Sequence, residues 1–279
     1  MSRRTLWLAI VLTFAAPLAA SAISFSSELS SLIIHAEPGE EVVRSFELHL
    51  AQGGSGANFT ARVEDWWTSE DGLRSFYRPP GSVQQSCGPW TEIDPVDAKV
   101  EAGGTLRIRV TTAVPSDANP GGYWCVLTVD EQPDPLAPTG AVEVRFLSSI
   151  SVGIFVYLPG FDRAAKITEV AVADGRASVT VVNEGNAPAR VDGQFEFYRA
   201  GETSPVAIAE LPRSTLLLAP APSRRIAVDL PAADVLPDGR YLVRAVLDIG
   251  LEHFLGAQKE LDVRRERTLL ARDPKGSGR

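Results

Sequence analysis

Few side chains in this chain of 279 residues have the types and spacing that chemistry requires. His35, His49 and His253 are its histidines, and no two of them could share a hairpin or a helix turn, as a zinc site would need. The sequence contains neither the G-x-S-x-G elbow of a serine nucleophile nor a glycine-rich phosphate-binding loop.

Carboxylates are the remaining candidates for catalysis. Glu64-Asp65 and Glu70-Asp71 could in principle hold a cation or act on a glycosidic bond. Asp71-Gly72, however, has the form of a hairpin turn, and neighbouring acids on a turn are usually solvated. We therefore expect solvated acids here, and the sequence predicts a protein that is not an enzyme and that holds no metal and no other cofactor.

The two cysteines suggest a different chemistry. Cys87 and Cys125 form an even pair within one half of the chain, which favours a disulfide if the protein is exported. Two free buried thiols and an intermolecular link are the alternatives. A redox-active pair is not expected, because the C-x-x-C spacing is absent.

The N-terminus has the form of an export signal. Arg3 and Arg4 precede an apolar stretch at 6–18, and small residues follow up to Ala22. Pro17 and the shortness of the apolar run argue against a membrane anchor, which needs about 20 apolar residues. We expect residues 1–22 to be a signal peptide that is cleaved after Ala22.

Composition and patterning predict an all-β protein. The chain has 23 glycines and 20 prolines, and its apolar residues form short alternating runs between turns. Its net charge of −8 argues against nucleic acid as a partner. Strands are expected at 23–36, 42–50, 59–67, 106–110, 123–129 and 141–158, and again at 167–173, 177–182, 193–198, 225–230, 240–248 and 254–263, with an Asp174-Gly175 turn between the first two of the second set. This spacing, which restarts after Pro159-Gly160, predicts two consecutive immunoglobulin-like β-sandwich domains at 23–159 and 160–264, followed by a disordered tail at 265–279.

One local pattern occurs in both expected domains. Pro115–Val129 and Pro231–Ile249 each begin with proline, continue through a glycine turn and place a tyrosine just before an apolar strand. In immunoglobulin-like domains a tyrosine at this position ties a corner of the sandwich through its hydroxyl. We therefore assign Tyr123 and Tyr241 a structural role.

Trp66 and Trp67 are adjacent in an expected strand, where successive side chains point to opposite faces. One tryptophan is therefore expected in the core and the other on the surface.

Several motifs, in this order, resemble those of the periplasmic pilus-assembly (fimbrial) chaperones of bacteria. They are EPGEEV at 37–42, DWWTSEDG at 65–72, VPSDANPGGYW at 114–124 and ISVGIFVYLPG at 150–160. The resemblance covers nearly all of the mature chain. It implies a periplasmic chaperone without catalytic activity, which binds pilin-like or other exported subunits and has an outer-membrane usher as a second partner.

The chain departs from this family at the residues that clamp a subunit's C-terminal carboxylate. The family places one basic residue in the first strand and another in the last strand of the first domain. Residues 23–43 contain no lysine or arginine here, and Gly153, Ile154 and Phe155 stand near the expected place in the last strand. No anchor residue is therefore assigned.

The last strand of the first domain itself fits the family's mechanism. Its even positions from 142 to 156 are apolar except for Ser148, and we expect Ile150 to Val156 to belong to the core. Val142, Val144 and Phe146 follow a proline-rich loop and are predicted to form an exposed edge that pairs with a strand of the subunit. The alternative is a structural or adhesive module of the cell envelope that has no client.

Overall fold

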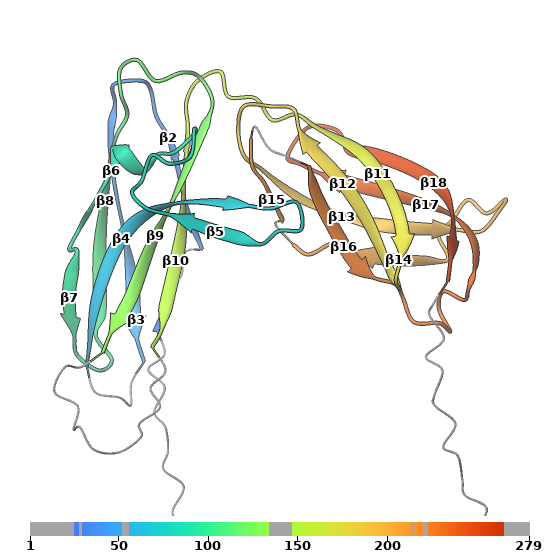
Figure 1. The fold of residues 1–279 in the computed structure, drawn as a ribbon, viewed down its shortest axis with the longest axis horizontal. Helices are drawn as coiled ribbons and strands as arrows, with labels where there is room; N and C mark the ends of the chain where they lie inside the picture. Colours follow the sequence, from blue (N-terminus) through green and yellow to red (C-terminus); the bar gives the residue numbers. More distant parts are fainter. Residues whose placement is uncertain are drawn as a thin grey trace, which may run out of the picture.

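The computed structural model describes residues 25–27, 30–51, 56–133, 147–213, 215–219 and 223–264. In these ranges every regular element is a β-strand except η1, a short 3-10 helix (Gly88–Trp90). The strands form four sheets, which make two sandwiches that meet at an elbow (Figure 1). The predicted fold, all-β with two immunoglobulin-like domains, is confirmed.

The first sandwich contains strands β1 to β10. One sheet has the order β1 (Phe25–Ser27), β3 (Glu41–Leu50), β8 (Thr105–Ala113) and β6 (Thr91–Asp94). The other has the order β2 (Ser31–His35), β10 (Ser149–Tyr157), β9 (Gly122–Gln132), β4 (Ala57–Thr68) and β5 (Arg74–Tyr77), and β7 (Asp97–Val100) also pairs with β4. The chain changes sheets between β1 and β2, because β1 pairs antiparallel with β3 whereas β2 pairs parallel with β10.

The second sandwich contains strands β11 to β18. One sheet has the order β11 (Ala165–Ala173), β12 (Arg176–Asn183) and β16 (Arg224–Asp229). The other has the order β14 (Ala207–Glu210), β13 (Ala189–Tyr198), β17 (Gly239–Asp248) and β18 (Leu255–Val263), and β15 (Thr215–Leu217) also pairs with β13. The first hydrophobic core ends at Leu158, and Ala165 is the first residue that packs against the second core.

The alternation of the sequence determines which residues reach each core. On β10, Val152, Ile154 and Val156 are buried in the first core and Ile150 packs against it, as predicted from their even positions. The Asp174-Gly175 turn also forms between paired strands β11 and β12, and both turn residues have positive φ, as a type I′ hairpin requires.

The sequence patterns missed the shortest strands. The segments β5, β6, β7, β14 and β15 contain three or four residues each, too few for a period of two to be distinguished from chance. All four residues of β5 are exposed, so this strand forms by pairing with β4 and without a buried face of its own.

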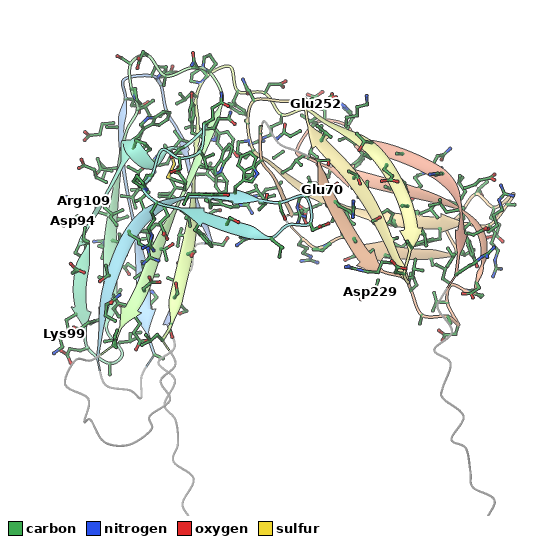
Figure 2. All side chains as sticks on the ribbon, in the orientation of Figure 1. Glu70, Asp94, Lys99, Arg109, Asp229 and Glu252 are labelled. Carbon is green, nitrogen blue, oxygen red and sulfur yellow. A yellow bond between two sulfur atoms is a disulfide. The ribbon has the colours of Figure 1, made fainter. Side chains whose placement is uncertain are left out.

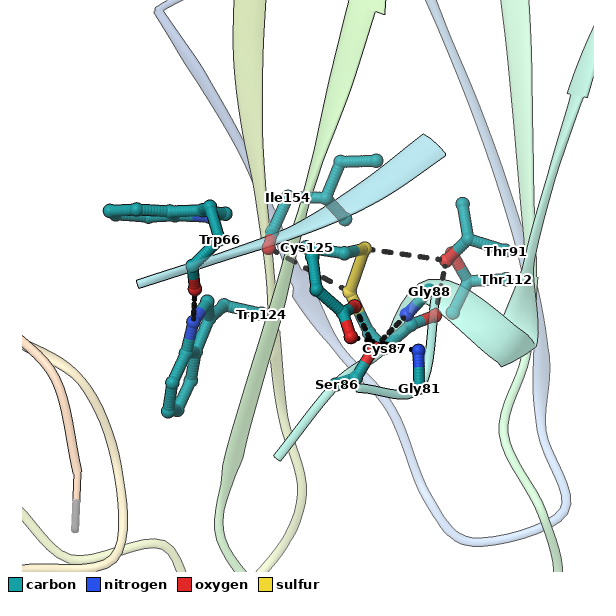
Figure 3. Close-up of a disulfide and its surroundings, with 11 residues drawn as sticks. Trp66, Gly81, Ser86, Cys87, Gly88, Thr91, Thr112, Trp124, Cys125 and Ile154 are labelled. Atoms are coloured by element: carbon teal, nitrogen blue, oxygen red, sulfur yellow. Dashed lines mark hydrogen bonds between the residues drawn. A yellow bond between two sulfur atoms is a disulfide. The ribbon is translucent and has the colours of Figure 1, made fainter. Parts of the chain in front are cut away.

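Cys87 and Cys125 form a disulfide, as the sequence predicted, with their Cα atoms 5.4 Å apart (Figure 3). Both cysteines are fully buried in the first core. Cys125 lies on β9 and Cys87 directly precedes η1, whose following residue Thr91 donates a 2.9 Å hydrogen bond from its hydroxyl to the carbonyl of Cys87. The disulfide thus attaches the long segment between β5 and β6 to the centre of the sheet.

Tyr123 and Tyr241 occupy matching places in the two domains. The hydroxyl of Tyr123 donates to the carbonyl of Asn119 at 2.9 Å, and that of Tyr241 donates to the carbonyl of Pro237 at 3.0 Å. Each acceptor lies four residues upstream, which is the geometry of a tyrosine corner. Both rings are buried in the cores of their domains.

The disulfide leads to a prediction about stability. Cys87 and Cys125 are 38 residues apart, and closing a loop of that length stabilises the folded chain by about 4 kcal/mol in the chain-entropy model. Replacing both cysteines with alanine should therefore lower the free energy of unfolding in urea by about 2–5 kcal/mol. Thiol titration of the unfolded, unreduced wild-type protein should find no free sulfhydryl. Titratable thiols, or an unchanged urea midpoint in the double variant, would contradict this assignment.

Candidate functional site

The largest functional surface of the first domain is the side of the β2-β10-β9-β4 sheet that faces away from the first core. Alternate residues of these strands belong to that core, such as Leu127 and Val129 on β9. The intervening residues therefore form the opposite side of the sheet, which we call the outer face. It consists of Ser31, Ile33 and His35 on β2; Ser149, Ser151, Gly153, Phe155 and Tyr157 on β10; Trp124, Val126, Thr128 and Asp130 on β9; and Arg62, Glu64 and Trp66 on β4.

One half of the outer face is aromatic and is covered by the second domain. Trp66, Trp124 and Phe155 are buried in a cluster that also contains Ala187 and Leu218 of the second domain. The Trp66 and Phe155 rings meet edge to face with centroids 6.4 Å apart, and the Trp124 indole nitrogen donates to the Trp66 carbonyl at 3.0 Å (Figure 3). This cluster joins the two domains.

The tryptophan pair differs from what the sequence predicted. Trp66 is buried between the domains instead of in a sandwich core, and Trp67 is not a free surface residue. The Trp67 ring packs on Trp124 at a centroid distance of 5.7 Å. The reason is that a sheet in a two-domain protein can bury both of its faces, so alternation alone does not distinguish a core residue from an interdomain residue.

Main-chain groups of the second domain complete the elbow. The carbonyl of Asn186 accepts hydrogen bonds from the Gly122 amide at 2.9 Å and from the Gln85 side chain at 3.0 Å. The Tyr157 hydroxyl donates to the carbonyl of Pro188 at 3.2 Å. A β-carbon at Gly122 would lie only 2.6 Å from the Pro188 ring, so glycine permits the close approach of the two domains.

The β4–β5 hairpin makes a second contact between the domains. Its tip residue Glu70 reaches the second domain (Figure 2), where its carbonyl accepts hydrogen bonds from the Arg225 amide at 2.8 Å and the Arg224 guanidinium at 2.7 Å. Its carboxylate accepts a hydrogen bond from Ser223 at 3.1 Å and lies 3.5 Å from the Arg225 guanidinium. Asp71 is 3.7 Å from the same guanidinium. These two acids therefore hold the domains together.

Asp65 is fully buried, which contradicts the expectation that the neighbouring acids are solvated. Its carboxylate accepts hydrogen bonds from the amides of Gly81 and Val83, at 2.8 and 2.9 Å, and from the hydroxyl of Ser86. Three donors compensate for the loss of hydration. The carboxylate thus fixes the loop that leads to Cys87, which is a structural role.

Glu64 is also buried, and it belongs to an ionic network in the second half of the outer face. Its carboxylate pairs with Arg62 at 3.1 Å and with Arg78, and Arg62 also pairs with Asp130. Burial raises the pKa of Glu64, but hydrogen bonds from Arg78 and Arg62 outweigh that effect and hold the pKa below its usual range. The Ser149 hydroxyl donates to Asp130 at 2.6 Å, so the network extends to β10.

The β10 strand has an unpaired edge next to this network. It pairs with β9 along its full length, whereas its pairing with β2 begins only at Gly153. Among the residues that the structure describes, no strand pairs with Ser149–Val152 on the β2 side. The amide of Gly153 donates to Ser30 on that side at 3.3 Å. Because main-chain groups alternate between the two edges of a strand, those of Ser149 and Ser151 also point to the unpaired edge.

The predicted subunit-binding residues Val142, Val144 and Phe146 lie outside the described residues. The structure therefore places only the strand that follows them. The sequence analysis missed Arg190 of the second domain, whose guanidinium donates to the hydroxyl of Ser31 on β2 at 2.7 Å. Its approach to the first domain has no counterpart in a sequence motif, because the two residues are far apart in the chain.

The described residues contain no group of three or more histidine, cysteine, aspartate and glutamate side chains arranged to hold a metal ion. His35 stacks on Tyr157 at the elbow, with ring centroids 5.5 Å apart, and His49 bonds to Thr105 in the other sheet at 3.0 Å. Within the same residues, no helix has both the length and the apolar character needed to cross a bilayer.

Comparison with known proteins finds similarity in structure but none in sequence. No protein-family profile and no curated protein matches the chain. Among solved structures, a chain of the Salmonella enterica SafA pilin–SafB chaperone complex is 10% identical, with a TM-score of 0.48, over 86% of this chain and 99% of that one. The Pseudomonas aeruginosa CupB2 chaperone is 15% identical, with a TM-score of 0.45, over 85% and 100% of the two chains. A chain of the chaperone–tip adhesin complex of CFA/I fimbriae is 11% identical, with a TM-score of 0.47, over 85% and 98%.

The fold and the outer face thus define a protein with two immunoglobulin-like domains, joined by an aromatic cluster, and with an unpaired strand edge in the first domain. Any activity must use these features, so the proposed function depends on the geometry of this chain.

Glu64 provides a test of the ionic network. Because its pKa is lowered in the folded protein, its contribution to stability is fully present above its ordinary pKa of 4.5 and is lost as the pH falls through the lower, folded value. Glu64→Gln should lower the free energy of unfolding by about 1–3 kcal/mol at pH 7. The difference from wild type should shrink below about pH 4.5. Urea unfolding across this pH range measures both effects.

Glu47→Gln is the matched control for this experiment. Glu47 is an exposed acid that lies 3.5 Å from the exposed Arg107, and such pairs contribute about 0–1 kcal/mol. Equal losses for the two variants, or a Glu64 effect that grows as the solution is acidified, would show that the network has been misread.

Proposed function

We propose that this protein is a periplasmic chaperone-like protein that binds pilin-like or other exported subunits by β-strand pairing, without catalysis. The observation that supports the proposal is the unpaired edge of β10 at Ser149–Val152. A strand from a client that pairs there would extend the β2-β10-β9-β4 sheet, and its main-chain hydrogen bonds would supply affinity without demanding a particular sequence.

The outer face beside this edge is suited to a transient partner. Ser149 and Ser151 are exposed and polar, and the Arg62–Asp130 pair lies close by. A flat edge with exposed apolar side chains would aggregate, whereas polar side chains keep an open edge soluble until a partner arrives. The geometry therefore allows pairing and limits pairing with the wrong partner.

Val142, Val144 and Phe146 would supply the apolar part of the binding site. They have the same parity as Ile150 and Val152, which face the first core. If β10 continues toward its N-terminal side, these side chains extend the apolar side of the strand beyond the described sandwich. There they would contact side chains of the client, which the sandwich core does not cover.

Affinity in this proposal comes from main-chain pairing and apolar contact rather than from an ionic anchor. The described part of β2 and β10 contains no lysine or arginine. Arg190 is the guanidinium that reaches β2 from the second domain, where it bonds to Ser31. Export to the periplasm and delivery of the subunit to an outer-membrane usher belong to the same proposal, and the sequence resemblance supports both.

The client edge can be tested with Phe146→Asp and Val144→Asp. Burying a phenylalanine or valine side chain contributes about 1.5–3 kcal/mol, so each variant should recover far less co-exported pilin-like subunit. The free energy of unfolding of the free protein should change by less than about 0.5 kcal/mol, as is usual for a surface substitution. The two measurements are thermal unfolding of the purified variant and co-purification of subunits from the neighbouring genes.

Two control variants make this test specific. Leu147→Asp changes an adjacent, half-exposed apolar residue of opposite parity, and it should leave capture close to that of wild type. Arg190→Ala should also have little effect, since no anchor is proposed. If Phe146→Asp unfolds the free protein by several kcal/mol, this face belongs to the core, and the structural or adhesive envelope module becomes the better explanation.

A further inference from the structure

The second domain contains a groove that the proposed function does not use. It has a volume of about 620 Å³ and is lined by Asp192, Gly193, Gln194, Glu210, Leu211, Arg213, Val246, Asp248 and Phe254. These residues come from β13, from the end of β14 and the loop after it, from the end of β17, and from the residue before β18. A groove of this size is large enough for several side chains of a ligand.

The charges of the groove favour a cation. Three carboxylates line it, whereas Arg213 is the one guanidinium among the lining residues. Asp192 and Asp248 stand directly opposite each other on the neighbouring strands β13 and β17. Like charges in this arrangement destabilise a sheet, and a cation bound between them would remove that cost. Glu210 pairs with Gln194 across β13 and β14, so it lies on the same side of the sheet.

An aromatic residue adds a second feature that fits a cation. The side chain of Phe254 is 68% exposed, although it lines the groove beside Asp248. A cation above an aromatic face gains about 0.5–2 kcal/mol, and the aliphatic stem of lysine or arginine also covers apolar surface. An exposed phenylalanine next to carboxylates therefore fits the long, positively charged side chain of lysine or arginine.

The backbone keeps the floor of the groove shallow and leaves an edge beside it. A β-carbon at Gly193 would lie 2.2 Å from the carbonyl oxygen of Val246, so β13 and β17 can approach this closely only with glycine there. The groove borders β14, which is the last strand on its side of the sheet order. Among the described residues, no strand pairs with the outer edge of β14.

We infer that this groove binds an extended protein segment that carries lysine or arginine at alternate positions. The edge of β14 would pair with its main chain, and the carboxylates and Phe254 would receive its cationic side chains. A small amine would use only the second of these features, and the groove volume far exceeds what one amine needs. The inference concerns the second domain alone and does not depend on the β10 edge.

The chain's own basic C-terminal residues are the main competing occupant. However, β18 begins next to the groove and ends at Val263, so the chain leaves the domain about 26 Å from Phe254. Glu252, by contrast, lies at the elbow end of the second domain, close to the groove in sequence (Figure 2). The geometry thus favours a separate partner, and a truncated chain tests the alternative.

The test uses the mature chain, residues 23–279, and a labelled nonapeptide that alternates arginine and leucine. A second peptide has the neutral isostere citrulline in place of each arginine. Fluorescence anisotropy should show saturable binding of the arginine peptide and binding at least tenfold weaker for the citrulline peptide. Phe254→Ala should weaken binding about tenfold, and the double variant Glu210→Gln, Asp248→Asn should weaken it further and reduce its dependence on salt.

Glu252→Gln and Leu251→Ala are the matched controls, because both residues are exposed in the same loop but do not line the groove. They should bind as wild type does. The inference is overturned if no saturable binding occurs, if both peptides bind equally, or if the groove variants bind like the controls. It is also overturned if binding appears only after residues 265–279 are deleted, since the tail would then be the natural occupant.

Discussion

The burial of the aromatic half of the outer face is the constraint on which the arrangement of this protein depends. The β2-β10-β9-β4 sheet already covers the first core with one side, yet its other side also presents Trp66, Trp124 and Phe155. Large aromatic surfaces are costly to leave in water, so the second domain must cover them. This requirement fixes the elbow, and the polar contacts at Asn186 and Glu70 then select one angle from those that hydrophobic burial would allow.

The same constraint separates the two halves of the sheet by function. Near the elbow the strands are covered on both sides and have little freedom to accept a partner. At the other end the outer face is polar, and the only strong interactions are ion pairs and hydrogen bonds around Glu64 and Asp130. A strand edge is therefore left free at the end of the domain where pairing with another chain does not disturb the interdomain contact.

Much of the fold could be predicted from the sequence because period-two alternation is a local signal. Long strands such as β8, β9 and β17 have that signal, and the type I′ turn at Asp174-Gly175 has its own. The site was less predictable. The burial of Asp65 depends on amides of Gly81 and Val83, and nothing in the local sequence shows that these donors lie beside it. Interdomain residues present the same difficulty, since Trp66 has the alternation of any half-buried strand.

The buried carboxylates also explain why a sandwich can hold a long irregular segment between β5 and β6. That segment lacks a sheet partner for most of its length, so its amides need other acceptors. Asp65 accepts from two of them, and the disulfide of Cys87 with Cys125 holds the far end of the segment on β9. The irregular backbone is thus held at both ends by interactions that originate on the central strands β4 and β9. Because these strands also form the outer face, the loop, the disulfide and the binding surface share one support, and a change that loosens either strand will affect all three.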